Sequence, residues 1–338
     1  MKLYNTVKEL CLCPSISGRE QKICALLAKR VAPFCDEVRT DALGNLIALK
    51  KGSASNAKKI MLDAHMDEIG FLATFIEDSG MIRVANVGGI SFAASAFSKV
   101  VSENGVKGVL VPDSKTKAAD YKSDVFYIDI GAKTKKLAEA RVKIGDFFVA
   151  APSLEKLMGT RIAGRPLDDR IGCAILLGIA EKIAKTGTAH DVYYVFSVQE
   201  EVGCRGALPA AFSIAPDFAL CFDVTGTGDT PAATPMACSV GGGAAIKIKD
   251  ASVICNEGVV KKLTELAKAN NIKHQKEILL YGGTDTSAMQ LAGSGAAAGA
   301  LSIPSRYIHS GVEVCDLDDV QCCIDLAVAF IADDLGSI

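Results

Sequence analysis

Three apolar runs in this chain each end in side chains that can bind a metal ion or move a proton. The runs and the residues after them are 59–64 before His65, Asp67 and Glu68, 191–198 before Glu200 and Glu201, and 218–222 before Asp223. Short runs rich in Val, Ile, Tyr and Phe are typical of buried strands. In an open α/β sheet the strand ends meet at one edge, where such folds place their chemistry. The pattern therefore predicts an α/β fold with imidazoles and carboxylates along that edge.

The size and charge of the chain limit what surrounds such a site. A length of 338 residues suits two domains. The net charge of -2 gives no reason to expect nucleic acid or an anionic membrane as a partner. No apolar run reaches the length that spans a membrane, and the first residues lack the layout of a signal peptide. We therefore expect a cytoplasmic protein.

The cysteines point to the same compartment. The chain has 12 of them, scattered along its length, and the closest groups, Cys11 with Cys13 and Cys322 with Cys323, lack the paired spacing of a zinc knuckle. A disulfide framework is not expected in a chain of this length without an export signal. We interpret the cysteines as small buried hydrophobic residues in a reducing environment.

The composition changes in the middle of the chain. From about residue 71 to about residue 160 short β-like runs dominate, and Asn104-Gly105 is a hairpin signal between two of them. Helices alternate with strands again from residue 161. We therefore expect a catalytic domain of residues 1–70 and 161–338, with residues 71–160 inserted as a β domain. In the first part a helix is expected over residues 19–34, capped by Ser15 or Ser17.

Eight side chains are candidate ligands. They are His65, Asp67, Asp168, Asp169, Glu200, Glu201, Asp223 and His309. Mixed imidazole and carboxylate ligands suit Zn, Co or Mn. The set is large enough for two metal ions that share a carboxylate, which leaves another carboxylate to handle protons.

Each of these residues also has an ordinary structural interpretation. Asp168-Asp169 precedes an apolar helix and would stabilise it by about 1 kcal/mol as an N-cap. Asp223 could follow its strand as a turn residue, and His65 and His309 could be hydrogen-bonded core histidines. Only 4 His occur in the chain, however, and two of them stand at expected strand ends beside carboxylates. The joint occurrence favours a metal site.

Six short motifs resemble the co-catalytic metal aminopeptidases of the glutamyl, deblocking and tetrahedral (TET-type) family. They are AHMDEIG at 64–70, PLDDRIG at 166–172, QEEVGCRG at 199–206, FDVT at 222–225, GGTD at 282–285 and RYIHS at 306–310. The motifs occur in the order of the family and span nearly the whole chain. The resemblance implies a mixed-sheet metallopeptidase domain with helices on both faces. It also implies that the insertion is a small β-barrel-like domain that dimerises.

The resemblance also implies roles for single residues. One metal ion takes His65, Asp168 and Asp223, and the other takes Asp168, Glu201 and His309, so that Asp168 bridges. Asp67 orients His65, and Glu200 is the general base. Alternation along a strand is expected to separate Glu200 from Glu201. Arg170 and Thr284-Asp285 are expected to shape the site.

These roles predict a metal-dependent aminopeptidase with two divalent ions per subunit, zinc first and cobalt or manganese as alternatives. A water bridged by the metal ions attacks the first peptide bond, Glu200 takes its proton, and the substrate is a peptide with a free N-terminus. The alternative is a dinuclear deacylase or amidase acting on small acylated amino acids or sugars. A glycosidase is disfavoured because Glu200 and Glu201 are adjacent, whereas paired glycosidase carboxylates stand about 5 to 9.5 Å apart. A non-enzymatic scaffold would not need a complete ligand set.

The sequence leaves the preferred N-terminal side chain open, because it does not place Arg306, Arg205 or a lysine in the substrate pocket. For assembly, the resemblance implies homo-oligomers, in which dimers combine into a hollow tetrahedral dodecamer. Closed symmetry is the common arrangement for identical subunits. A mean hydropathy of +0.27 agrees with apolar surface covered by partner subunits.

Overall fold

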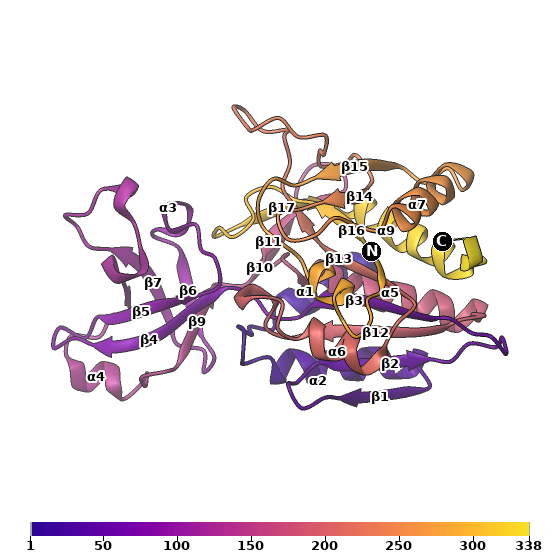
Figure 1. Cartoon of the computed structure of the whole chain (residues 1–338). Coiled ribbons are helices and arrows are strands. Elements are labelled where there is room, and N and C mark those ends of the chain that lie inside the picture. Colours follow the sequence, from indigo (N-terminus) through magenta and orange to yellow (C-terminus); the bar gives the residue numbers. More distant parts are fainter. Residues whose placement is uncertain (1, 338) are drawn as a thin grey trace.

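The computed structural model describes residues 2–337, which form two bodies joined side by side (Figure 1). The larger body contains an eight-stranded mixed sheet in the order β1-β2-β12-β3-β13-β16-β14-β15. The bounds of these strands are Glu37–Thr40, Leu46–Lys50, Asp191–Ser197, Lys59–His65, Phe218–Thr225, Ala297–Pro304, Ala244–Lys249 and His274–Ile278, in that order. The predicted α/β fold with a mixed sheet is confirmed.

The centre of the sheet is parallel. Strand β3 pairs in parallel with β12 on one side and β13 on the other, and β13 pairs in parallel with β16. These strands are nearly continuous apolar runs because both faces of the sheet are covered; every residue of β13 is buried. Since parallel strands point the same way, the carboxyl ends of β3, β12 and β13 lie at one edge.

Helices cover both faces of the sheet. One face is covered by five helices, α1 (Lys2–Cys11), α2 (Gln21–Val31), α5 (Arg170–Thr186), α7 (Glu257–Ala269) and α9 (Leu317–Ala332). The opposite face is covered by α6 (Ala207–Ile214) and α8 (Thr286–Gln290). Side chains of β3 alternate between the two layers: Ile60 and Leu62 pack under the first set, and Met61 packs under the second. None of the helices in residues 2–337 has the length and hydropathy needed to cross a membrane.

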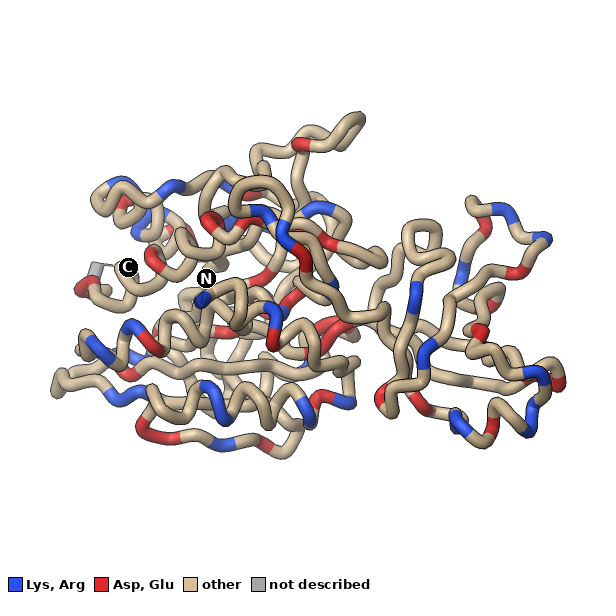
Figure 2. Tube along the Cα trace, turned by 180° about the vertical axis from the view of Figure 1, so that it is seen from behind, with Lys and Arg blue, Asp and Glu red and all other residues tan. Residues whose placement is uncertain are grey.

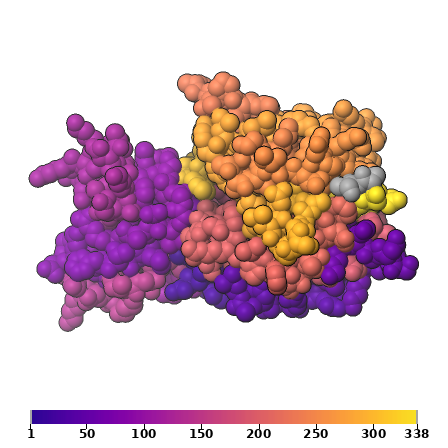
Figure 3. Space-filling view, viewed as in Figure 1, coloured from indigo at the N-terminus to yellow at the C-terminus, as the bar shows by residue number. Residues whose placement is uncertain are grey.

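The smaller body is a closed six-stranded barrel in the order β4-β5-β8-β7-β6-β9. Its strands are Gly70–Ile76, Ile82–Val87, Phe126–Asp129, Lys107–Pro112, Lys99–Ser102 and Phe147–Ala150, and it also carries the short helices α3 (Phe92–Ser95) and α4 (Lys135–Glu139). Phe71, Phe126 and Phe148 fill its interior. Figure 3 shows the barrel as a separate lobe beside the larger body.

The root of the barrel is tightly packed. A Cβ atom on Gly70 would lie 2.5 Å from Cγ2 of Ile16 and 2.7 Å from the carbonyl oxygen of Phe148. Ile16, which belongs to the larger body, forms a small apolar cluster with Phe147 and Val149 of β9. The barrel therefore contacts the larger body through the Ile16 side chain, which packs beside Gly70 and against β9. After it, β10 (Ser153–Lys156) and β11 (Arg161–Arg165) form a three-stranded antiparallel sheet with β17 (Glu313–Asp316).

The expected capping of the second helix was wrong. Helix α2 follows Glu20, whose side chain makes no capping hydrogen bond. The two serines proposed as caps instead contact the segment after β3: the backbone N–H of Ser15 donates to Glu68, and the hydroxyl of Ser17 donates to Asp67. Helix α1 was not predicted. Acidic and basic residues are interspersed over both bodies, in keeping with the small net charge (Figure 2).

Candidate active site

The carboxyl edge of the parallel strands gathers the candidate ligands around a cavity of about 430 Å³. His65 is the last residue of β3, and Asp223 lies near the end of β13. Asp168 directly precedes the N-cap residue of α5, Glu200 and Glu201 form a 3-10 turn after β12, and His309 lies in the loop between β16 and β17. Five different segments thus converge on one place.

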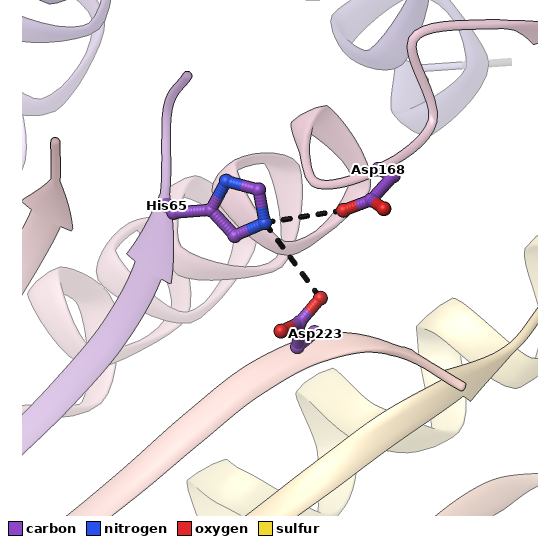
Figure 4. A group of neighbouring side chains, drawn as sticks. All are labelled: His65, Asp168 and Asp223. Atoms are coloured by element: carbon purple, nitrogen blue, oxygen red, sulfur yellow. Dashed lines mark hydrogen bonds and ion pairs between the residues drawn. The ribbon is translucent and has the colours of Figure 1, made fainter. Parts of the chain in front are cut away.

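The first group consists of His65, Asp168 and Asp223 (Figure 4). Nε2 of His65 lies 3.1 Å from Oδ1 of Asp168 and 3.8 Å from Oδ1 of Asp223. All three side chains are buried. One imidazole nitrogen and two carboxylate oxygens at such separations form one side of a coordination shell for a transition metal or zinc.

The second group consists of Asp168, Glu201 and His309. Nε2 of His309 lies 3.1 Å from Oδ2 of Asp168 and 3.2 Å from Oε2 of Glu201. The other oxygen of Glu201, Oε1, is buried and has no hydrogen-bond partner among the described residues. Because an unpaired buried carboxylate oxygen is costly, the residues present fit a bound cation. Asp168 belongs to both groups and offers a different oxygen to each.

The pKa shifts of His65, Glu201 and His309 reflect the concentration of negative charge at the site. Burial alone would lower the pKa of His309, but its contacts with Asp168 and Glu201 raise that pKa to about 11. Burial likewise opposes protonation of His65, yet hydrogen bonds with Asp168, Asp223 and Asp67 raise its pKa well above the ordinary value. Burial, with Asp168 close by, raises the pKa of Glu201 to about 7. Two imidazoles that hold protons so strongly mark a place with a strong affinity for positive charge.

Asp67 contacts His65 and the turn that carries Glu200 and Glu201. Nδ1 of His65 lies 3.2 Å from the carbonyl oxygen of Asp67 and 3.4 Å from its Oδ1. The Asp67 carboxylate also accepts the backbone N–H of Glu200 at 3.0 Å and that of Glu201 at 3.3 Å. One buried carboxylate therefore fixes both the imidazole ring and the turn that carries the two glutamates, in the way that outer residues orient metal ligands.

Glu200 and Glu201 are separated, but not by strand alternation. Strand β12 ends at Ser197, and Gln199 has a left-handed backbone (φ 57°) that starts the 3-10 turn Glu200–Val202. In this turn Glu201 joins Asp168 and His309, while Glu200 groups with Cys204 and Asp285. Burial, together with neighbouring carboxylates, raises the pKa of Glu200 well above its ordinary value. The strand argument for this separation was therefore wrong, since the residues lie beyond the strand.

Asp169 is one of the eight candidate ligands but belongs to neither ligand group; it and its neighbour Arg170 have structural roles. The side chain of Asp169 accepts the backbone N–H of Gly172 at 3.0 Å and caps α5, so the N-cap interpretation holds for this member of the pair. Arg170 is fully buried and donates to the carbonyl oxygens of Met66 and Cys13 and to Glu68. Arg170 thus ties the segment after β3 to the N-terminus of α5.

Two buried groups near the site were missed at the sequence level. Glu20 accepts the backbone N–H of Gln199 at 3.2 Å, and burial raises its pKa to about 7. The second group is the Asp63 carboxylate of β3, which lies 3.2 Å from the hydroxyl of Ser197. That hydroxyl also donates to Asp285 at 2.7 Å. No periodicity indicates a contact between residues as distant in sequence as Glu20 and Gln199. The acidic residue within the apolar run of β3 was the available signal for Asp63.

Comparisons with known proteins agree with this geometry. Residues 44–326 match the M42 glutamyl aminopeptidase family. A lysyl aminopeptidase of Pyrococcus furiosus is 34% identical over 341 residues, with 97% of this chain and 96% of that protein covered. The solved structure of aminopeptidase APDkam598 from Desulfurococcus kamchatkensis superposes with a TM-score of 0.95 at 35% identity and covers 100% of this chain and 97% of its own.

A TET1 peptidase of Pyrococcus horikoshii, described as able to assemble into a tetrahedron or a large octahedral shell, superposes with a TM-score of 0.84 at 32% identity. That comparison covers 98% of this chain and 99% of the other. The suspected family and the expected peptide-hydrolysing class are confirmed by these matches. The chain belongs to the M42 glutamyl aminopeptidase family.

Proposed function

We propose that this aminopeptidase works with two divalent metal ions, which its candidate active site holds through a shared carboxylate. The observation that carries the proposal is the position of Asp168. Its two oxygens each lie 3.1 Å from a different imidazole nitrogen, one of His65 and one of His309. A carboxylate in this position is suited to bridge two cations, whereas a purely structural aspartate needs no second imidazole.

The roles follow from the two groups. His65, Asp168 and Asp223 would hold one ion, and Asp168, Glu201 and His309 the other. Zinc suits this mixture of nitrogen and oxygen donors, and cobalt or manganese would suit it as well. When bound, two such ions would supply a nucleophile from water at neutral pH and would stabilise negative charge on the carbonyl oxygen of the substrate.

Glu200 handles the protons in this proposal. It lines the same cavity as the ligands but stands outside both ligand groups. Its carboxylate accepts a proton from the attacking water and delivers it to the nitrogen of the leaving amine. The raised pKa of Glu200 suits a group that must hold a proton between these two steps. Asp67 keeps His65 and the Glu200–Val202 turn in place.

The test combines metal content with substrate choice. Dialysis against a chelator should abolish hydrolysis of a peptide with a free N-terminus, and added Zn, Co or Mn should restore it. Elemental analysis of the restored protein should find two ions per chain, and Asp168→Ala should lose both. Full activity of verified metal-free protein would contradict the proposal. Cleavage of N-acylated amino acids in preference to free peptides would favour the deacylase alternative, which uses the same metal chemistry.

We also propose that residues 71–160 act as an inserted dimerisation domain and that the dimers combine into a closed homo-oligomer. Two observations support this proposal. The TET1 relative is described as forming tetrahedral and octahedral shells. The barrel also exposes large apolar side chains, including Phe97 at 67% and Ile144 at 61%, which a partner would cover.

A further inference from the structure

We propose that this enzyme prefers substrates whose N-terminal residue has a neutral aliphatic side chain, and that Leu279 forms part of the wall that recognises it. The inference rests on the proposed aminopeptidase function and names the substrate class of that site. It starts from the residues around the cavity. Its acidic lining consists of Asp168, Glu200, Glu201 and Asp223, each of which has a proposed role as metal ligand or base.

Apart from the proposed metal ligands and the proposed base, the cavity wall has no charged side chain within residues 2–337. Val224, Leu279 and Ile308 supply the larger apolar surfaces, Cys204 and Thr225 are the other side chains, and the remaining lining residues are glycines. Among the described residues, no lysine or arginine lines this cavity. The one hydroxyl in the wall, Oγ1 of Thr225, donates to Glu277 at 2.9 Å and is already committed.

Three basic side chains close to the site in sequence or in space, Arg205, Lys247 and Arg306, do not line the cavity. Arg306 donates to both oxygens of Asp229, at 3.0 and 2.7 Å, and lines a different surface hollow. Lys247 is fully buried, where its ammonium group binds Glu277 and lies 3.5 Å from Asp250. Arg205 follows the Glu200–Val202 turn but is exposed and does not line the cavity.

A charged substrate side chain would therefore find no partner here. A glutamate would lose its hydration without meeting a free cation. A lysine would meet only carboxylates that are needed for the metal ions or for proton transfer. Burial of a charge without a partner is costly, whereas burial of an aliphatic side chain is favourable. The wall thus selects for Leu or Met over Glu and Lys.

Leu279 is the residue placed to make this choice. It lies just after β15, where a Cβ atom built on Gly226 would be 4.0 Å from its Cδ1 and one on Gly282 would be 3.8 Å from its Cδ2. Because both glycines lack a side chain, the Leu279 side chain faces open space beside them in the cavity lining. It belongs to none of the hydrophobic core clusters of the described residues. A change at Leu279 should therefore alter the cavity without unfolding the protein.

The first experiment measures kcat/KM of the metal-loaded enzyme for a series of aminoacyl p-nitroanilides carrying Leu, Met, Ala, Glu and Lys. We expect Leu and Met to exceed Glu and Lys by at least about tenfold, the range that hydrophobic pockets achieve. Free leucine should also raise Tm of the metal-loaded protein more than free glutamate does. A preference for Glu or Lys would overturn the inference but leave the proposed function standing. Absence of cleavage for all aminoacyl amides would overturn the proposed function as well.

The second experiment tests Leu279 itself. Leu279→Lys should raise the ratio of Glu to Leu hydrolysis by at least about tenfold, because it supplies the missing cation. Leu280→Lys is the matched control: this neighbour is 57% exposed and does not line the cavity, so its ratio should stay that of the wild type. Equal ratios in wild type and Leu279→Lys, with two metal ions bound, would remove Leu279 from the wall.

Discussion

At the scale of single residues, substitutions of the neighbours Glu200 and Glu201 should affect turnover and metal content differently. Glu200→Gln keeps the size of the side chain and removes the proposed base, so turnover should fall by about 100-fold or more while both metal ions stay bound. Glu201→Gln removes the charge of a proposed ligand and should lower metal content instead. The measurements are kcat and elemental analysis of each variant. Metal loss in Glu200→Gln with retention in Glu201→Gln would reverse the two roles.

The sequence could indicate which residue types meet at this edge, but not how they meet. Apolar runs located His65 and Asp223, because a strand end is a local property of the chain. The separation of Glu200 from Glu201 depends on the left-handed backbone of Gln199. Gln rarely adopts this conformation, so its presence in the sequence does not predict such a turn. The hydrogen bond from the backbone N–H of Gln199 to Glu20 is a tertiary contact, which local sequence patterns do not predict.

At the scale of elements, the N-terminus of α9 carries a titratable group that should make stability depend on pH. Asp319 is 1% exposed and accepts the backbone N–H groups of Gly241 and Gly243. Burial raises its pKa from 3.8 to about 6. The folded state therefore binds this proton more tightly than the unfolded state. Its contribution to stability is complete below about pH 4 and is lost as the pH rises through about 6.

This difference in pKa corresponds to about 3 kcal/mol across that window. Asp319→Asn removes the titration and also one acceptor, so the variant should be less stable at pH 4. Its deficit relative to wild type should shrink by about 2–3 kcal/mol between pH 4 and pH 7. Free energies of unfolding from denaturant titrations at several pH values would show this. Parallel curves for the two proteins would contradict the prediction.

The sequence predicted the helix over residues 19–34 and the three strands that lead to the site, and the errors have physical causes. Helix α2 buries Ile23, Leu27 and Val31 on one face, a pattern that is local in the sequence. Ser15 and Ser17 have the chemistry of helix caps, but tertiary contacts with Glu68 and Asp67 use their polar groups. Closure of the β-like runs into a barrel was indicated only by the family resemblance, because closure depends on pairing between β4 and β9, at opposite ends of the insertion.

At the scale of the whole molecule, the proposed assembly predicts where a charge should break it. Phe97 is 67% exposed on the barrel and already has a positive φ of 64°, which Asp tolerates. Phe97→Asp should therefore reduce the mass measured by light scattering while each chain keeps its metal ions. Phe212→Asp is the matched control, since Phe212 is 69% exposed on α6 of the larger body. A monomeric mass for fully active wild type would refute the closed assembly.

The packing around Gly70 has a consequence for such an assembly. In a shell of identical subunits, a small error in the angle between neighbours is repeated at every contact, and the shell fails to close. Gly70 leaves no room for a side chain between Ile16 of the larger body and the backbone of Phe148. A methyl group at residue 70 should therefore push the barrel away from Ile16 and tilt it relative to the larger body. In the proposed shell, this tilt would change the angle at which neighbouring subunits meet.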